Sequence, residues 1–249
     1  MRKDNHPRFI FRDIGLQEYP VTWNLQKSLV AARAQNVVPD TILLVEHPPV
    51  FTFGRTASQE QFTVPYKHES ACAGGIPVVH IDRGGGVTYH GPGQSVIYPI
   101  IALKIREQRL HWLLRCYEEI AIRTLQCFAI PATREPGKTG IWSARGKIAS
   151  IGIGIKHWIT YHGIAVNIKA DLRPFELIHP CGLKGCQMVN AASFGNEKIS
   201  VNDFNNALKA TFEHVWNEFW GAATHMPVTT DVKKSAAHTH TSRLHAQQS

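Results

Sequence analysis

The chain has 249 residues, of which 43% are hydrophobic, so it is long enough for one sizeable core and has the composition of a globular protein. Its formal net charge of +8 indicates acidic partners, but the basic residues are scattered without aromatic interleaving, which argues against nucleic acid. No stretch approaches about eighteen consecutive apolar residues, and residues 1–11 lack the apolar region of an export signal. We therefore expect a cytoplasmic protein that does not contact a membrane.

The chain contains five cysteines, an odd number that fits neither a disulfide framework nor a paired C-x-x-C zinc motif. A reducing compartment is the simplest interpretation, and we expect neither a metal ion nor another cofactor. His238 and His240 would chelate a metal only weakly, because they lie in a polar tail outside any core.

Apolar periodicity in the first half of the chain predicts short strands and one helix. The apolar residues between Tyr19 and Asn36 have the spacing of a helix with one buried side, and Pro20 is tolerated in its first turn. Two X-Pro steps at His47-Pro48-Pro49 predict a fixed kink between two strands. The predicted strands are Phe9–Asp13, Thr41–Glu46, Val50–Phe53, Ile76–Ile81 and Ser95–Leu103, and the polar residues 56–75 predict a mobile loop.

The second half of the chain predicts a helix, a meander and a final helix. Leu110 to Phe128 has the i, i+3, i+4, i+7 apolar spacing of a helix lying on a sheet. A capping box of Ser200 and Asp203 begins the last helix, which runs through Phe219. The meander strands are Gly140–Trp142, Lys147–Ile155 and Trp158–Asn167, followed by an irregular segment at 171–188. We expect one catalytic domain at residues 1–228 and a disordered tail at residues 229–249, which lack an apolar period.

A glycine-rich stretch from Arg83 to Gln94 separates two of the predicted strands. Its glycines remove side chains where a ligand would lie against bare backbone, which favours a binding loop connecting the two strands. The alternative is a glycine-rich hairpin without a ligand. Gly137-Lys138-Thr139 is not a phosphate loop, because Pro136 lacks the backbone N–H that such a loop needs, and no G-x-G-x-x-G leads from a strand into a helix.

Cys181 lies in an irregular segment rich in glycine and proline, where reactive groups are commonly placed. Gly182 directly after it would allow a backbone N–H to approach an oxyanion. The alternative is a buried, inert thiol, which we expect for Cys72, Cys116 and Cys127.

A nucleophilic cysteine needs a group that lowers its pKa or takes its proton. Lys147 begins an otherwise apolar strand, so it lies either at a solvent-facing rim or in a functional position. His90, His162 and His179 are rival bases, and spacing in the sequence does not choose among the four.

Four stretches of the chain are informative when taken together. They are Arg83-Gly-Gly-Gly-Val-Thr-Tyr-His-Gly-Pro-Gly-Gln94, Gly146-Lys-Ile-Ala-Ser-Ile-Gly152, Tyr161-His-Gly-Ile-Ala-Val-Asn167 and Pro180-Cys-Gly182. In their order and spacing they resemble the octanoyltransferases of lipoate biosynthesis. The similarity extends from about Phe9 to Phe219 and includes the segment from Glu46 to Thr52, although Asn190 stands where threonine is expected.

The resemblance implies an α/β (α+β) fold like that of biotin and lipoate protein ligases, with a twisted mixed β-sheet packed by helices and a smaller second sheet. It also implies that octanoyl passes from octanoyl-acyl carrier protein to a lysine ε-amine of a lipoyl domain through a cysteine acyl-thioester. The implied acceptors are the lipoyl domains of 2-oxoacid dehydrogenase E2 subunits and the glycine cleavage H protein. A thioester is already activated, so ATP is not required, and acidic partners would account for the basic net charge.

Carried over to this sequence, the resemblance implies that Cys181 is the nucleophile and that Lys147 lowers its pKa and shuttles protons. Cys186 is an extra thiol nearby that could form a disulfide with Cys181 under oxidation. The residues implied to line the acyl and pantetheine site are Arg83, Gly84, Gly85, Gly86, Val87, Thr88, Tyr89, His90, Ser150, Ile151, Gly152, Gly163, Ile164 and Ala165.

Two other functions are compatible with this fold. An ATP-dependent lipoate or biotin protein ligase would need an adenylate-binding loop and would not need Cys181. A non-catalytic acyl-binding scaffold would carry Cys181 as an inert thiol.

Overall fold

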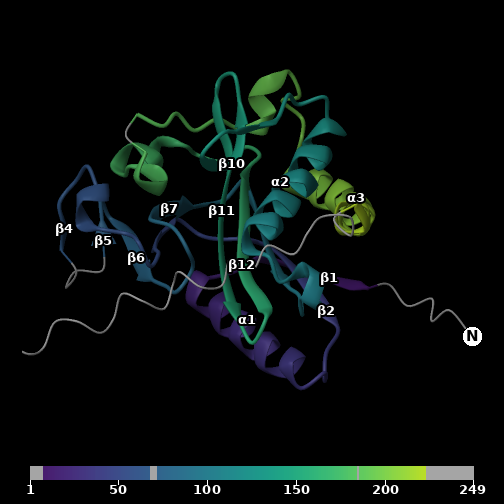
Figure 1. Cartoon of the computed structure of the whole chain (residues 1–249). Coiled ribbons are helices and arrows are strands. Elements are labelled where there is room, and N and C mark those ends of the chain that lie inside the picture. The colour runs from purple at the N-terminus through teal and green to yellow at the C-terminus, as the bar shows by residue number, and fades with distance from the viewer. Residues whose placement is uncertain (1–7, 68–71, 184, 223–249) are drawn as a thin grey trace, which may run out of the picture.

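The computed structural model describes residues 8–67, 72–183 and 185–222, and at Lys67, Arg106 and Cys181 it describes the backbone alone. The tail expected at residues 229–249 lies outside the described residues. Within the described ranges the chain forms two mixed sheets and three α-helices (Figure 1). The predicted α/β architecture, with a larger sheet packed by helices and a smaller second sheet, is confirmed.

The larger sheet has seven strands among the described residues, in the order β1-β2-β8-β12-β11-β10-β9. β1 and β2 are parallel, and the other neighbours are antiparallel. The predicted meander is confirmed, and β9 extends it at the edge of the sheet. The strands are β1 (Phe9–Leu16), β2 (Asp40–Glu46), β8 (Gln94–Ile100), β9 (Thr133–Glu135), β10 (Lys138–Ser143), β11 (Gly146–Lys156) and β12 (Ile159–Asn167).

The smaller sheet has the strand order β4-β5-β6-β3-β7. The chain enters it through the predicted kink at His47-Pro48-Pro49 and returns to the larger sheet through residues 91–93. β4 and β5 lie within residues 56–75, where only a loop was predicted, because strands of two residues are too short to show a period. The strands are β3 (Val50–Phe53), β4 (Tyr66–Lys67), β5 (Cys72–Ala73), β6 (Ile76–His80) and β7 (Val87–His90).

Helices cover both faces of the larger sheet (Figure 1). α1 (Tyr19–Ala34) packs on one face through Leu29 and Val30, and α2 (Leu110–Gln126) and α3 (Val201–Ala222) share a core with the other face. The predicted capping box is confirmed, since Ser200 N donates to Asp203 Oδ2 at 3.0 Å and Asp203 N donates to Ser200 Oγ at 3.1 Å.

The glycine-rich stretch differs from the single connecting loop that was predicted. Residues 84–86 form a loop, Val87–His90 form β7, and the predicted flanking strands belong to different sheets. β11 pairs with β10 only as far as Ala149. The glycine loop lies against the part of β11 beyond this pairing, where Gly84 N donates to Ile153 O at 2.9 Å. The smaller sheet thus presents the glycine loop to the middle of the larger sheet.

Candidate active site

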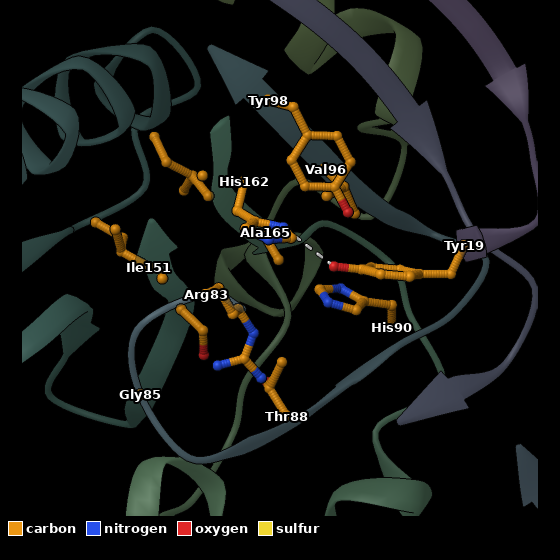
Figure 2. A pocket seen from close by; sticks show the side chains of 14 residues that line it. Tyr19, Arg83, Gly85, Thr88, His90, Val96, Tyr98, Ile151, His162 and Ala165 are labelled. Atoms are coloured by element: carbon orange, nitrogen blue, oxygen red, sulfur yellow. Dashed lines mark hydrogen bonds between the residues drawn. The ribbon is translucent and has the colours of Figure 1, made fainter. Parts of the chain in front are cut away.

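A narrow pocket lies between the glycine loop and the middle of β11 and β12 (Figure 2). Val96, Ile151, Ile164 and Ala165 give it apolar walls. Of the residues implied to bind substrate, the structure gathers most around this pocket, namely Arg83, Gly85, Thr88, His90, Ser150, Ile151, Gly152, Gly163, Ile164 and Ala165.

Four of the implied residues lie elsewhere. Gly84 lines a neighbouring cavity. Val87 and Tyr89 are buried in the core of the smaller sheet, and Gly86 packs against the side chain of Gln61. For Val87 and Tyr89 the cause is the alternation of β7, because successive side chains of a strand point to opposite faces and Thr88 and His90 take the face that turns toward the pocket.

Arg83 fixes the glycine loop to β3. Its side chain is only 7% exposed, and its Nη2 donates to Thr52 O at 2.8 Å and to Thr52 Oγ1 at 2.9 Å. Its Nη1 donates to Gly84 O at 3.0 Å. A charged donor that binds both β3 and the loop holds the pocket wall in place.

Two buried hydroxyl groups in the pocket wall have no hydrogen-bond partner among the described residues. They are Thr88 Oγ1 and Ser150 Oγ. A buried hydroxyl without a partner is costly, so a ligand that offers a carbonyl or an amide would stabilise this wall.

His162 joins the pocket to the surface through a chain of hydrogen bonds. Its Nε2 lies 2.9 Å from Asp82 Oδ1, and its Nδ1 lies 3.3 Å from Tyr19 Oη, the contact drawn in Figure 2. Because an ionised carboxylate only accepts, Nε2 carries the proton and Tyr19 donates to Nδ1. The backbone of His162 has a φ of 55°, which is a strained value for a residue other than glycine.

The buried histidines beside the pocket are neutral near pH 7. Burial lowers the pKa of His162 to about 4, against the raising effect of Asp82, and lowers the pKa of His47 to about 4. Burial also lowers the pKa of His90 well below its usual value, and the nearby charge of Arg83 acts in the same direction. His90 and His162, two of the rival bases, are therefore uncharged walls of the pocket.

Lys147 lies in the interior and not at a solvent-facing rim, so that alternative is wrong. Its side chain is 0% exposed, and its Nζ lies 5.2 Å from the centre of the Trp142 ring. Gly140 makes room for it, since a Cβ at that position would lie 2.6 Å from Lys147 Cε. The segment after Cys181 is fixed to the same strand, because Lys147 N donates to Gln187 O at 2.8 Å and Val189 N donates to Lys147 O at 3.0 Å.

Cys181 lies in a 3-10 turn, Pro180–Gly182, that packs against β7. Gly182 N donates to His179 O at 2.9 Å within this turn. The expected oxyanion donor is therefore already engaged, which corrects the prediction for Gly182. His179, the third rival base, lines a different cavity from the pocket. The side chain of Cys181, and hence its possible pairing with Cys186, lies outside the described part of the structure.

Gln61 connects the glycine loop to the turn that carries Cys181, which we call the cysteine turn, and no pattern in the sequence indicated this role. Its Oε1 accepts from Val87 N at 2.8 Å, and its backbone oxygen accepts from His179 N at 2.6 Å. A Cβ on Gly86 would meet Oε1 at 2.3 Å, and a Cβ on Gly182 would meet Nε2 at 3.4 Å. The missing side chain of Gly86 thus makes room for the carboxamide, whereas the distance at Gly182 is an ordinary van der Waals contact.

Neither a metal centre nor a membrane span is found in the described ranges. They contain no group of three or more histidine, cysteine, aspartate or glutamate side chains arranged to hold a metal ion. None of the helices in these ranges has the length and apolar character needed to cross a bilayer.

Solved structures with this architecture define the class of protein. A bi-partite lipoate protein ligase from Thermoplasma acidophilum superposes with a TM-score of 0.63 at 16% identity, covering 88% of this chain and 91% of the other. A lipoate-protein ligase A bound with ATP gives a TM-score of 0.63 at 14% identity, covering 87% and 91%. The fold is that of the lipoate protein ligase-like α/β proteins.

The sequence comparisons then give the family. The model of the lipoyl protein ligase A/B catalytic domain matches residues 18–213, and the chain belongs to this family. The chain is 40% identical to an octanoyltransferase of Geobacter metallireducens over 209 residues, which cover 84% of this chain and 94% of that protein. It is also 40% identical to an octanoyltransferase of Thermosynechococcus vestitus over 204 residues, with coverages of 82% and 88%.

Replacing Gln61 tests its role between the loop and the turn. In Gln61→Ala, Val87 N–H loses its acceptor, so its amide hydrogen should exchange about tenfold faster while the fold persists. Gln61→Glu keeps an acceptor at the same reach and should preserve most of the protection. Gln59→Ala, an exposed neighbour in the same 3-10 turn (Gln59–Gln61), is the matched control and should leave the exchange unchanged. Wild-type protection in Gln61→Ala would show that Gln61 does not hold the loop.

The buried histidines predict a pH dependence of stability. Between pH 6.5, the ordinary pKa, and about 4, the unfolded chain binds a proton at His47 that the folded chain does not. The free energy of unfolding should therefore decrease as the pH falls through this window, by about 2 kcal/mol per such histidine between pH 7 and pH 5. Urea titrations of the wild type and His47→Gln measure it, and the variant should show a smaller loss. Equal losses in the two proteins would contradict the assignment.

Proposed function

We propose that this protein is an octanoyltransferase that moves an octanoyl group from octanoyl-acyl carrier protein to the ε-amine of a lysine on a lipoyl domain. Relatives named octanoyltransferase, 35–40% identical over most of the chain, support the acyltransferase activity. The observation that carries the proposal is the buried Lys147, fixed on β11 to the segment that follows the Cys181 turn.

In the first half-reaction the Cys181 thiolate attacks the carbonyl carbon of the donor thioester. A bond forms between Cys181 sulfur and the octanoyl carbon, and the bond to the pantetheine sulfur breaks. Lys147, as an ammonium, favours the Cys181 thiolate and gives its proton to the departing pantetheine thiolate. In a water-poor site the attraction between ammonium and thiolate is stronger than in bulk solvent.

In the second half-reaction the acceptor lysine amine attacks the octanoyl-Cys181 thioester. The carbon–nitrogen bond of the amide forms, and the carbon–sulfur bond breaks to restore the thiolate. Lys147, now a neutral amine, takes the proton that the attacking nitrogen loses and returns to its ammonium form. Protons and charges balance over the cycle without ATP.

The pocket suits an acyl chain joined to an amide-containing carrier. The walls formed by Val96, Ile151 and Ile164 would pack on the octanoyl methylenes. The unpaired hydroxyls of Thr88 and Ser150 would bind the polar groups at the thioester end. The acceptors we propose are the lipoyl domains of 2-oxoacid dehydrogenase E2 subunits and the glycine cleavage H protein, in the cytoplasm.

A ligase of the same fold is distinguished by its substrates. Incubation with ATP, free octanoate and a lipoyl domain should yield no octanoylated product. Incubation with octanoyl-acyl carrier protein and the same domain should yield it. Product from the first mixture alone would favour the ligase.

The covalent route predicts that Cys181 is indispensable. Cys181→Ser and Cys181→Ala should lose transfer by at least about a thousandfold, because a serine hydroxyl provides no comparable anion to exchange with a thioester. Intact mass after mixing with octanoyl-acyl carrier protein should show one octanoyl group that hydroxylamine releases, and no adduct in either variant. Cys186→Ala is the control and should keep most activity. Near-normal transfer by Cys181→Ala would remove the covalent intermediate.

Variants of Lys147 test its pairing with Cys181. Lys147→Met keeps much of the bulk but no charge, so it should raise the apparent pKa for iodoacetamide alkylation of Cys181 and slow both half-reactions. Lys147→Arg keeps the charge but holds its proton, so it should preserve acylation better than amide formation. Alkylation rates at about pH 5 to 10, with folding checked by circular dichroism, measure the first effect. An unchanged alkylation profile in Lys147→Met would contradict the pairing.

A further inference from the structure

A second cavity of about 470 Å³ adjoins the pocket. The two cavities share Gly85, Ile151 and Gly152 in their walls, so they meet at the glycine loop. The second cavity is lined by β11 from Ile151 to Ile155, by the start of α2 and by residues 137–139 at the turn between β9 and β10. We call it the groove, and its apolar walls are Leu110, Leu114, Ile153, Ile155 and Leu183.

The groove begins beside the turn that carries Cys181. Leu183, which lines the groove, follows Cys181 by two residues. A molecule bound along the groove would therefore have one end at this turn.

The charge of the groove is positive. Arg55 and Lys138 line it, and its described lining contains no carboxylate. Arg55 is exposed and Lys138 is 43% exposed. Lys138 also lies 3.6 Å from Glu135, but both side chains of this pair are well hydrated, which leaves much of the lysine charge available.

We propose that this groove binds the phosphopantetheine arm of the acyl donor and that Arg55 and Lys138 contact its phosphate. The inference rests on the proposed function, and it assigns the donor a specific path. The arm is a flexible chain of methylenes and amides with a thiol at one end and a phosphodiester at the other. Its thiol end belongs at Cys181, its methylenes match the leucine and isoleucine walls, and its anionic end matches two basic side chains.

The acceptor lysine does not fit the same features. Its side chain is short and leaves most of a cavity of about 470 Å³ empty. Its ammonium is cationic, and Arg55 and Lys138 would repel it. Size and charge therefore both favour the donor arm as the occupant.

The decisive experiment compares donors that differ only in the phosphate. Acylation of the full-length enzyme by octanoyl-pantetheine and by octanoyl-phosphopantetheine is followed by intact mass in single turnovers, for the wild type and for Arg55→Glu/Lys138→Glu. The double variant should lose about tenfold or more in the acylation rate with the phosphorylated donor and less than about twofold with the other. Lys27→Glu, an exposed lysine on α1 across the larger sheet, is the matched control and should change neither rate.

The outcomes separate this inference from the proposed function. Acylation of the wild type by octanoyl-pantetheine establishes the acyl-enzyme whether or not the phosphate is recognised. Equal rates of the two donors in the wild type, or an equal loss with both in the double variant, would overturn the phosphate site and leave the transferase intact. Unchanged acylation together with a changed KM for the lipoyl domain would assign the groove to the acceptor instead.

Discussion

The burial of the Lys147 side chain is the constraint on which the rest of the site depends. An ammonium group in the interior loses its hydration, and partners that offer negative charge or aligned dipoles must compensate for that loss. Gly140 leaves space for the Lys147 side chain, and main-chain hydrogen bonds to Gln187 and Val189 fix the Lys147 backbone to the segment after Cys181. In the proposed mechanism, a thiolate formed at Cys181 adds a negative charge beside this cation. The same ion pair would then activate the nucleophile and compensate for the burial of the lysine charge.

The two sheets supply opposite sides of the proposed reaction centre. β11 and β12 of the larger sheet carry the lysine and the apolar wall, whereas the smaller sheet carries the glycine loop that Arg83 fixes to β3. The neutral histidines keep further positive charge out of the pocket interior, since burial lowers the pKa values of His90 and His162. An acyl chain would therefore meet apolar side chains and neutral histidines there, and the one charged group named in that wall, Arg83, is already engaged by Thr52 and Gly84. The basic residues proposed to contact the phosphate, Arg55 and Lys138, line the neighbouring groove.

The sequence predicted those parts of the fold that have a regular period. The helices, the meander and the Ser200 capping box were found from apolar spacing and capping residues. The two-residue strands β4 and β5 and the division of the glycine stretch were missed, because sheet pairing is decided by distant parts of the chain.

Chemistry at the site was harder to predict than the fold. The residues alone left Lys147 and three histidines as equal candidates, and the pairing with Cys181 came only from family resemblance. Gln61 gave no signal, since a polar residue in a polar loop has no pattern, and its contacts with Val87 and His179 span 26 residues and more of the chain. Arg55 and Lys138 are likewise ordinary surface residues until the fold brings them to one groove.

The central claim is that an octanoyl-Cys181 thioester lies on the reaction path. Rapid-quench experiments that follow the octanoyl-enzyme during turnover with octanoyl-acyl carrier protein and a lipoyl domain test it most directly. The account predicts that the adduct forms, and then decays to octanoylated lipoyl domain, with rate constants no smaller than kcat. An adduct that forms or decays more slowly than the enzyme turns over would be a side product and would contradict the mechanism.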